Sequence, residues 1–312
     1  MSESIGFEGR TVVVTGAGRN LGREYALAFA ARGANVVVND LGVGISDSDG
    51  SAETPSSNPA DDVVSEIRAA GGVAVANHDS VSTVEGGASI VECALDSFGA
   101  VDVVVNNAGQ VRMADFGDFP DASVDALIDT QLRGVLNVSR PAWRHMRSRG
   151  GGRFVNVSSG AAFGGVPNGA VYAMAKMGTI GLTRGMASEG AAHGITANVI
   201  VPYAKTRPGT GFGPIPWSEE LGEWLHPRLV APLTLWLSHE SCPLRGETIA
   251  VGGGWAGIVN TTLSAGYTDR DATPEDFAVH LDELGSVTVS PLTAFSSMAV
   301  RHLMSGFRGG RP

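Results

Sequence analysis

The stretch VVVTGAGRNLGREYALAF, Val12 to Phe29, decides the fold of this chain. Three valines run into a glycine-rich turn, and a helical pattern follows directly, with Leu21, Tyr25 and Phe29 on one stripe. A strand, a tight turn and a helix N-terminus form an anion-binding site, because backbone N–H groups and the positive helix end point at one place. The stretch therefore predicts the first βα unit of an α/β fold, with a phosphate-binding turn.

The glycines of this turn have separate predicted roles. Gly16 allows the sharp turn, Gly18 a close approach of the backbone to a ligand, and Gly22 close packing of helix on strand. Asn20 stands where a further glycine is usual, and asparagine tolerates left-handed dihedrals better than other side chains. An ordinary tight turn is the alternative, since a glycine-rich loop alone is a weak signal. The predicted binding turn contains Gly16, Gly18, Arg19, Asn20, Leu21 and Gly22.

Beyond this unit, short β-branched runs alternate with helix-length segments. The strand candidates are Thr11–Thr15, Asn35–Asn39, Val73–Ala76, Val101–Val105, Arg153–Val157, Thr196–Val201 and Thr248–Val251. The helix candidates are Leu21–Arg32, Asp61–Ala70, Val84–Phe98 and Val171–Ala192. Near-continuous apolar strands separated by helices indicate a parallel sheet that is buried on both faces. The predicted fold class is therefore α/β, a doubly wound parallel sheet of the Rossmann type.

The end of the chain departs from this alternation, so we expect a catalytic domain over residues 1–265 and a helical extension over residues 266–312. Thr273 to Asp276 reads as an N-cap, a first-turn proline and two acidic residues, followed by Phe277, Leu281 and Leu284 at helical spacing. Ser290-Pro291 opens a second helical pattern. Two such amphipathic helices are too small for a domain and are expected to bury their stripes on the main body or on a second subunit.

Composition narrows the class of partner and the compartment. The chain has 312 residues, 43% of them hydrophobic, and a formal net charge of -10, which makes nucleic acid an unfavourable partner. Two cysteines in a chain of this length do not form a disulfide framework. Residues 1–9 lack the order of a signal peptide, no run of about 18 apolar residues is present, and the end GFRGGRP carries no peroxisomal tripeptide. We therefore expect a cytoplasmic protein with no membrane partner, and the histidines show no metal-ligand spacing.

The second strand candidate ends at Asp40, and this acid predicts the type of cofactor. A carboxylate at this position accepts hydrogen bonds from the diol of an adenosine ribose, and it repels the 2′-phosphate of NADP. Arg19 acts in the opposite direction, because a basic residue in the turn can pair with that phosphate. A carboxylate facing a phosphate in a partly desolvated pocket is costly, whereas Arg19 can turn into solvent. The sequence therefore favours NAD.

Four motifs together resemble the short-chain dehydrogenase/reductase family: TGAGRNLG, NNAG (Asn106–Gly109), Ser159, and YAMAK (Tyr172–Lys176). Ser159 lies 13 residues before Tyr172, as in the catalytic pair of that family. VVVNDLG, APLTLWLSHESC, VGGGW and, in the tail, ATPEDF are similar to the (3R)-hydroxyacyl-CoA dehydrogenase region of the peroxisomal multifunctional enzymes of type 2. The family likeness covers roughly residues 9–258, and we expect a stand-alone dehydrogenase without a hydratase segment.

The resemblance implies a role for each catalytic residue. Tyr172 is the acid/base, and an ammonium at Lys176, one helical turn away, is expected to lower the pKa of the phenol. Lys176 is also expected to hold the nicotinamide ribose, and Ser159 to hydrogen-bond the substrate oxygen. Gln131, in TQLRG, matches an asparagine that supports a proton-relay water in the family; a retained relay and a purely structural role are equally open.

The same resemblance implies most of the cofactor site. Asp79 matches an acid that contacts adenine, with a helix N-cap as the alternative, and Pro202 begins the segment beside the nicotinamide. Tyr203 replaces the usual glycine after that proline. The expected cofactor-binding residues beyond the glycine turn are Asp40, Asp79, Ser80, Asn107, Ala108, Gly109, Tyr172, Lys176, Pro202 and Thr206.

Three hypotheses for the function follow. The first is NAD-dependent oxidation of a (3R)-3-hydroxyacyl-CoA in the β-oxidation of a fatty acid or a steroid side chain. The second is a hydroxysteroid or other alcohol dehydrogenase. The third is a regulator that binds NAD without turnover, suggested by the unusual Asn20 and Gln131. Relatives associate through helices around Asp121–Arg147 and Val171–Ala192, so a homodimer or homotetramer is expected, with a small acyl-CoA or steroid-like substrate.

Overall fold

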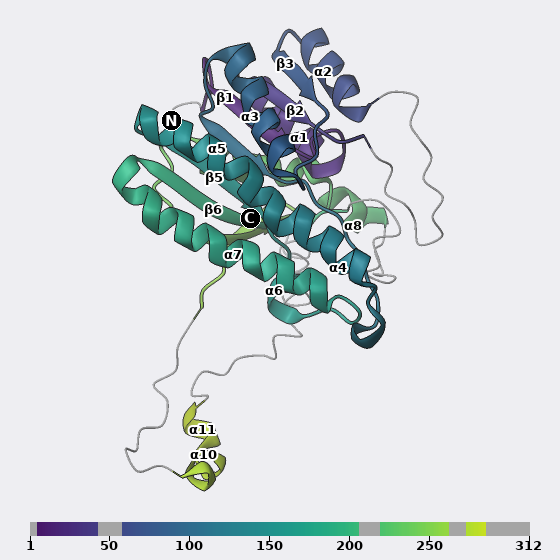
Figure 1. Cartoon of the computed structure of the whole chain (residues 1–312), viewed down its shortest axis with the longest axis vertical. Helices are drawn as coiled ribbons and strands as arrows, with labels where there is room; N and C mark the ends of the chain where they lie inside the picture. Colours follow the sequence, from purple (N-terminus) through teal and green to yellow (C-terminus); the bar gives the residue numbers. More distant parts are fainter. Residues whose placement is uncertain (1–4, 43–57, 206–218, 262–272, 285–312) are drawn as a thin grey trace.

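The computed structural model describes residues 5–42, 58–205, 219–261 and 273–284. Their centre is an eight-stranded sheet with the strand order β3-β2-β1-β4-β5-β6-β7-β8 (Figure 1). All neighbouring strands from β3 to β7 are parallel, and β8 runs antiparallel to β7. The strands are β1 (Thr11–Thr15), β2 (Asn35–Asn39), β3 (Val73–Asn77), β4 (Val103–Asn106), β5 (Gly152–Val157), β6 (Ile195–Pro202), β7 (Thr248–Gly252) and β8 (Trp255–Ile258).

Helices cover both faces of this sheet. On one face lie α1 (Asn20–Ala30), α2 (Pro59–Ala69) and α9 (Ala231–Ser238), and on the other α3 (Val84–Phe98), α5 (Gly134–Arg149) and α7 (Ala170–Gly190). Side chains alternate along a strand, so Val12 and Val14 of β1 pack in the first core, and Val13 packs in the second. Burial of every residue of β1 explains why its sequence is apolar throughout rather than alternating.

The predicted doubly wound α/β fold is confirmed, with small shifts at element ends. The strand expected at Val101–Val105 occupies Val103–Asn106, and helix α1 ends at Ala30 rather than at Arg32. Strand β8 was not predicted, because it has four residues and follows β7 through two glycines, Gly253 and Gly254, with positive φ. Helix α4 (Asp121–Ile128) lies within the helices that the resemblance implied around Asp121–Arg147, whereas α6 (Ala161–Gly164), α8 (Glu219–Trp224) and the π-helical turn Asp129–Arg133 were not predicted.

The strand order has one reversal, and it places the site. The chain passes from β1 outward to β2 and β3, and then returns to β4 on the other side of β1. Loops that leave the carboxyl ends of β1 and β4 therefore diverge, and ligands of open α/β sheets bind in the crevice that this leaves. The loops after β5 and β6 begin at this same carboxyl edge of the sheet, because both strands are parallel to β4.

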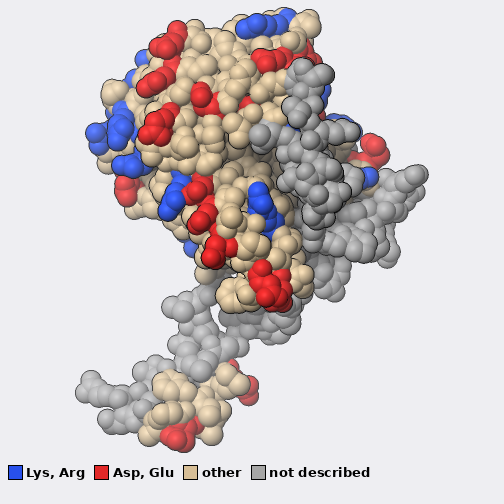
Figure 2. All heavy atoms as spheres, turned by 45° about the vertical axis from the view of Figure 1, so that its right-hand side comes forward, with Lys and Arg blue, Asp and Glu red and all other residues tan. Residues whose placement is uncertain are grey.

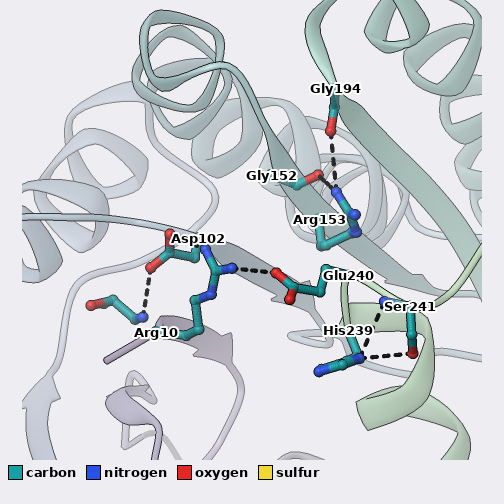
Figure 3. A network of polar contacts seen from close by, with 9 residues as sticks. Arg10, Asp102, Gly152, Arg153, Gly194, His239, Glu240 and Ser241 are labelled. Atoms are coloured by element: carbon teal, nitrogen blue, oxygen red, sulfur yellow. Dashed lines mark hydrogen bonds and ion pairs between the residues drawn. The ribbon is translucent and has the colours of Figure 1, made fainter. Parts of the chain in front are cut away.

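The opposite, amino edge of the sheet carries a network of charged groups (Figure 3). Arg10, directly before β1, pairs with Asp102 at 3.5 Å and with Glu240 at 2.5 Å. The Asp102 carboxylate also accepts a hydrogen bond of 2.8 Å from the Thr11 amide. Arg153 of β5 donates to the backbone oxygens of Gly152 and Gly194 at 3.0 and 3.1 Å. These contacts lie at the starts of β1, β4, β5 and β6, at the opposite edge of the sheet from the crevice between the loops after β1 and β4.

The predicted N-cap in the tail is confirmed, but the helix after it is shorter than expected. Thr273 and Asp276 form a capping box at the start of α10 (Pro274–Val279), and α11 (Leu281–Leu284) follows after a break at His280. Phe277 and Leu281 are 46% and 66% exposed, so the main body does not bury the expected stripe. The helix expected after Ser290 and most of the predicted extension over 266–312 lie outside the described residues.

Candidate active site

Tyr172 and Lys176 lie one turn apart on the same side of α7, near its N-terminus. Both side chains are buried, each 6% exposed. The Lys176 ammonium nitrogen Nζ donates a 2.9 Å hydrogen bond to the backbone oxygen of Val157, and it lies 5.9 Å from the centre of the Tyr172 ring. The last residue of β5 therefore fixes the lysine, and the helix fixes the phenol relative to it.

Ser159 lies two residues beyond β5, at the carboxyl edge of the sheet. Its hydroxyl makes a side-chain hydrogen bond with Tyr172, and it accepts a 3.3 Å bond from the amide of Ala161. The neighbouring Ser158 donates a 2.8 Å bond to the backbone oxygen of Lys176. The end of β5 and the start of α7 thus bring three of the four predicted catalytic side chains, Ser159, Tyr172 and Lys176, to one place.

The expected lowering of the Tyr172 pKa is wrong for this structure. Burial raises the pKa of the Tyr172 phenol, and the hydrogen bond with Ser159 offsets this only in part. Burial also lowers the pKa of Lys176 to about 8, because the charged ammonium loses its hydration. The lysine therefore stays mostly protonated at neutral pH and loses its charge only as the pH rises through about 8.

Gln131 lies in the π-helical turn Asp129–Arg133 between α4 and α5, and its side chain is 2% exposed. Its Nε2 donates a 2.5 Å hydrogen bond to the backbone oxygen of Gln110, and its backbone oxygen accepts a 3.4 Å bond from Thr179 of α7. Its side-chain oxygen Oε1 is buried and has no hydrogen-bond partner among the described residues. Gln131 therefore connects the loop after β4 to the helix that carries Tyr172, and π turns are frequent at functional sites.

The glycine turn has the geometry that its sequence predicts. Gly16 has φ +63°, and a Cβ there would lie 2.8 Å from the Cα of Ala108. A Cβ at Gly22 would lie 2.6 Å from the Asn107 side chain and closer still to the backbone oxygen of Gly16. Asn20 adopts a left-handed φ of 48°, so asparagine replaces glycine without loss of the turn.

Asp40 follows β2 and faces this turn. One carboxylate oxygen accepts a 3.0 Å hydrogen bond from the Gly18 amide, and the other accepts a 2.9 Å bond from the Gly42 amide. A Cβ at Gly18 would lie 2.8 Å from the carboxylate and 2.7 Å from Pro59 of α2. Each carboxylate oxygen keeps acceptor capacity beyond these bonds, as a ribose diol requires.

The NNAG segment is bonded directly to the glycine turn. Asn107 donates from its side chain to the backbone oxygens of Thr15 and Gly16 at 2.9 and 3.0 Å. The Thr15 hydroxyl accepts from the amides of Asn107 and Ala108 at 3.1 and 3.0 Å. A Cβ at Gly109 would lie 2.8 Å from the side-chain oxygen of Gln131. This segment therefore forms a close-packed floor between the turn and the catalytic helix.

Asp79 and Ser80 follow β3, the outermost strand on the side of β2. The Asp79 carboxylate accepts bonds from Ser89 at 2.6 Å and Asn77 at 2.8 Å, and these bonds lower the pKa of Asp79. The Ser80 hydroxyl lies 2.7 Å from that of Ser82. Thr83, not Asp79, is the N-cap of α3, so the alternative role of Asp79 as that cap is wrong.

Pro202 is the last residue of β6 and brings its loop to the edge that Ser159 occupies. Tyr203, which replaces the usual glycine, packs against the apolar cluster that includes Ile180 of α7, and burial raises the pKa of its phenol to about 12. Thr206, the last predicted cofactor residue, lies outside the described residues.

These residues fit a nicotinamide dinucleotide. The N-cap of α1, Arg19, makes no side-chain capping bond, which leaves the first amides of the helix available to a pyrophosphate. The cradle at Gly16, Gly18 and Gly22 is one that a Cβ would fill, and the Asp40 carboxylate stands beside it. The arrangement combines an anion site, an acceptor for a diol and a phenol for proton transfer along one sheet edge.

Sequence reasoning missed the residues that hold the predicted ones. Ser158 and the Val157 carbonyl anchor Lys176, although nothing in the sequence distinguishes them from other strand residues. A buried ladder joins β4 to β5 and α7: Asn106 donates to Asn156 at 2.8 Å, and Asn156 donates to Thr183 at 2.8 Å. Asparagines within apolar strands were the available signal, because a buried amide requires partners.

Charge is distributed widely over the surface. On the face that Figure 2 shows, acidic and basic side chains are interspersed over the described residues. Within the described ranges, no group of three or more His, Cys, Asp and Glu side chains could hold a metal ion. No helix among the described residues is long and apolar enough to cross a bilayer.

Comparison with known proteins identifies the family. The model of the short chain dehydrogenases matches residues 10–208. Peroxisomal multifunctional enzyme type 2 of Mus musculus is 47% identical over 88% of this chain and 36% of its own length, so the chain spans about a third of that relative. Acetoacetyl-CoA reductase of Shinella zoogloeoides is 32% identical over 78% of this chain and 98% of its own.

Among solved structures, a short chain dehydrogenase from Mycobacterium avium superimposes on this chain with a TM-score of 0.78 and is 34% identical in sequence. The match covers 92% of this chain and 98% of that one. The matched residues 10–208 include the glycine turn, NNAG, Ser159 and the Tyr172–Lys176 pair. The chain is therefore a member of the short chain dehydrogenase family, and an oxidoreductase.

Proposed function

We propose that this enzyme oxidises a secondary alcohol with NAD, and that the alcohol is a (3R)-3-hydroxyacyl-CoA, which becomes the 3-oxoacyl-CoA. The observation that carries the proposal is the convergence of Ser159, Tyr172 and Lys176 at the sheet edge that also holds the glycine turn and Asp40.

Each side chain has a defined task in this reaction. Tyr172 removes the proton of the substrate hydroxyl, and Ser159 hydrogen-bonds the oxygen as negative charge develops on it. Lys176, held by the Val157 carbonyl, supplies positive charge beside the phenol while it is protonated. Gln131 holds the loop after β4 against α7, and so keeps the cofactor floor in register with Tyr172. When bound, a nicotinamide dinucleotide supplies the acceptor for the hydride.

The preference for NAD over NADP rests on Asp40. Its carboxylate lies against the Gly18 amide, where the ribose of a dinucleotide on this turn would place its hydroxyls, and a phosphate there meets like charge. We expect kcat/KM to be at least tenfold higher with NAD than with NADP, and Asp40→Ser to narrow that ratio. Equal rates with both cofactors in the unmodified enzyme would contradict this preference.

Two relatives support the substrate class. One is named an acetoacetyl-CoA reductase and another a peroxisomal multifunctional enzyme. The alternative within enzymes is a hydroxysteroid or other alcohol dehydrogenase. Measuring NADH formation with (3R)- and (3S)-3-hydroxyacyl-CoA and with free hydroxysteroids distinguishes these two functions. Fast steroid oxidation without turnover of the 3R thioester would favour the hydroxysteroid dehydrogenase.

A function of another class, an NAD-sensing regulator without turnover, is favoured by one observation, the replacement of the usual asparagine by Gln131. Against it stand the connected Ser159, Tyr172 and Lys176. Normal NADH binding by the unmodified protein, with no turnover of any alcohol or ketone in a panel, would favour the regulator.

Assembly and location complete the proposal. Leu136 on α5 and Met174 and Met177 on α7 are 39%, 50% and 42% exposed, which supports a homodimer or homotetramer through these helices. We assign residues 1–265 to the catalytic domain and 266–312 to an extension that covers a neighbouring subunit's cleft. Light scattering, with and without residues 266–312, tests the oligomeric state and the part that the extension takes in it.

We also propose that the enzyme is located in the cytoplasm. Fractionation of cells decides between the cytoplasm and the peroxisome, which the name of the mouse relative suggests.

A further inference from the structure

The loop after β4, which packs near Tyr172, carries an exposed arginine, Arg112. Its neighbour Val111 packs in the apolar cluster that contains Tyr172. The Ala114 amide donates a 2.9 Å hydrogen bond to the backbone oxygen of Asn168, in the turn that leads into α7. Arg112 is therefore exposed on a rim formed by the loop after β4, which packs against the Tyr172 cluster and is bonded to the turn that leads into α7.

The Arg112 side chain is exposed but oriented. Its Nε donates a 3.1 Å hydrogen bond to the side-chain oxygen of Gln110, and Nη1 lies 3.5 Å from the hydroxyl of Ser123. Gln110 is itself fixed, because its Nε2 donates to the Ala126 backbone oxygen at 2.9 Å and to the Thr130 hydroxyl at 3.1 Å. The guanidinium is thus positioned by an amide that α4 and the π turn anchor.

Neutral groups alone hold this guanidinium. Arg10, Arg23 and Arg133 each pair with a carboxylate within 4.0 Å, whereas no such pair involves Arg112 within the part of the chain that the structure describes. The nearest acid in the sequence, Asp115, instead accepts a 3.0 Å bond from the Gly117 amide. A positioned arginine with no carboxylate partner among the described residues, in a chain of net charge -10, is suited to bind an anion of the substrate.

We propose that Arg112 binds a phosphate of the CoA part of the substrate. This rests on the proposed function, since an acyl-CoA carries its phosphates at the far end of the pantetheine arm from the thioester. With the 3-hydroxyl at Ser159 and Tyr172, the arm leads out of the buried site, and the phosphates reach the exposed rim. Arg112 then determines affinity for CoA thioesters over uncharged alcohols, and it takes no part in the chemical step.

The test compares two thioesters of (3R)-3-hydroxybutyrate, one with CoA and one with N-acetylcysteamine, which has no phosphate. Arg112→Gln is expected to raise KM for the CoA thioester about tenfold, the equivalent of ~1.4 kcal/mol, with kcat unchanged. The same change leaves kcat/KM for the N-acetylcysteamine thioester within about twofold of its original value, because no phosphate contact is lost there. Arg112→Lys retains part of the preference, since an ammonium keeps the charge without the fork geometry.

Arg147→Gln is the matched control, because it removes an equal charge from an exposed position at the far end of α5. It should change neither thioester's kinetics. Equal losses on both thioesters in Arg112→Gln, or no loss on either, would overturn the role of Arg112 and leave the proposed reaction intact. No oxidation of either thioester by the unmodified enzyme would overturn the proposed reaction, and the role of Arg112 with it.

Discussion

The two edges of the sheet differ in how exposed their titratable side chains are. At the amino edge, Arg10 is paired with two carboxylates, and the side chains of Arg10 and Glu240 are 50% and 68% exposed. At the carboxyl edge, Tyr172 and Lys176 are buried. Burial raises the pKa of Tyr172 and lowers the pKa of Lys176, so it favours the neutral form of each side chain. Exposed pairs cost little and contribute little, whereas buried titratable groups are costly and mark a functional site. The difference indicates that the carboxyl edge is organised for proton transfer and the amino edge for joining strands.

The largest effect is expected from Tyr172→Phe, which removes the proton acceptor and keeps the ring. Because general base catalysis supplies up to 10⁴-fold, we expect kcat to fall by about 10³-fold or more. NADH binding should remain within about twofold, since the change keeps the packing around α7. Steady-state rates and NADH fluorescence titration measure the two quantities. Residual activity above about a tenth of the original would assign the base to another group.

The next effect concerns pH. Oxidation requires the deprotonated form of Tyr172, and burial raises its pKa, so the phenol keeps its proton at neutral pH. We expect kcat/KM for oxidation to rise about tenfold per pH unit from neutrality to about pH 8, and less steeply above it, where Lys176 loses its charge. The reverse reduction uses the protonated form and should be nearly constant over the same interval. A flat profile for oxidation between pH 6 and 9 would show that Tyr172 is not the titrating group.

The comparison also separates what the sequence predicts from what it does not. The glycine turn and the spacing from Ser159 to Tyr172 are local patterns, and each depends on a few adjacent backbone positions, so the sequence predicts them. The paired charges at the amino edge join Arg10 to Glu240, 230 positions apart, and no local pattern reports such a pair.

The pKa of Tyr172 could not be predicted for a related reason. The spacing to Lys176 shows that both side chains lie on one side of a helix, but it does not show how deeply they are buried. Burial depends on residues from other elements, such as Leu127 and Ala161, that pack around the phenol. The sequence therefore predicted correctly that Tyr172 and Lys176 share one side of a helix, and it predicted the wrong sign for the pKa shift.

A smaller effect is expected from substitution of Gln131, whose hydrogen bonds hold the loop after β4 against α7. Gln131→Leu removes the bond to the Gln110 backbone oxygen and leaves that oxygen without this partner. We expect kcat to fall about tenfold, because the cofactor floor and α7 lose one of their connections. Gln131→Asn, the conservative variant, should stay within about threefold. If both variants were fully active and had unchanged pH profiles, the role of Gln131 would be purely one of packing.

The smallest effect is expected at the amino edge itself. Arg10→Gln removes two ion pairs, both partly exposed, and the Thr11 amide keeps its bond to Asp102. Because exposed pairs contribute little, the free energy of unfolding should fall by less than about 1 kcal/mol, and less still at high salt. Urea unfolding at two salt concentrations measures this, with kcat/KM determined in parallel and expected to be unchanged. A loss of activity larger than the loss of stability would mean that the two edges are coupled through β1, and that the division between a structural and a catalytic edge is wrong.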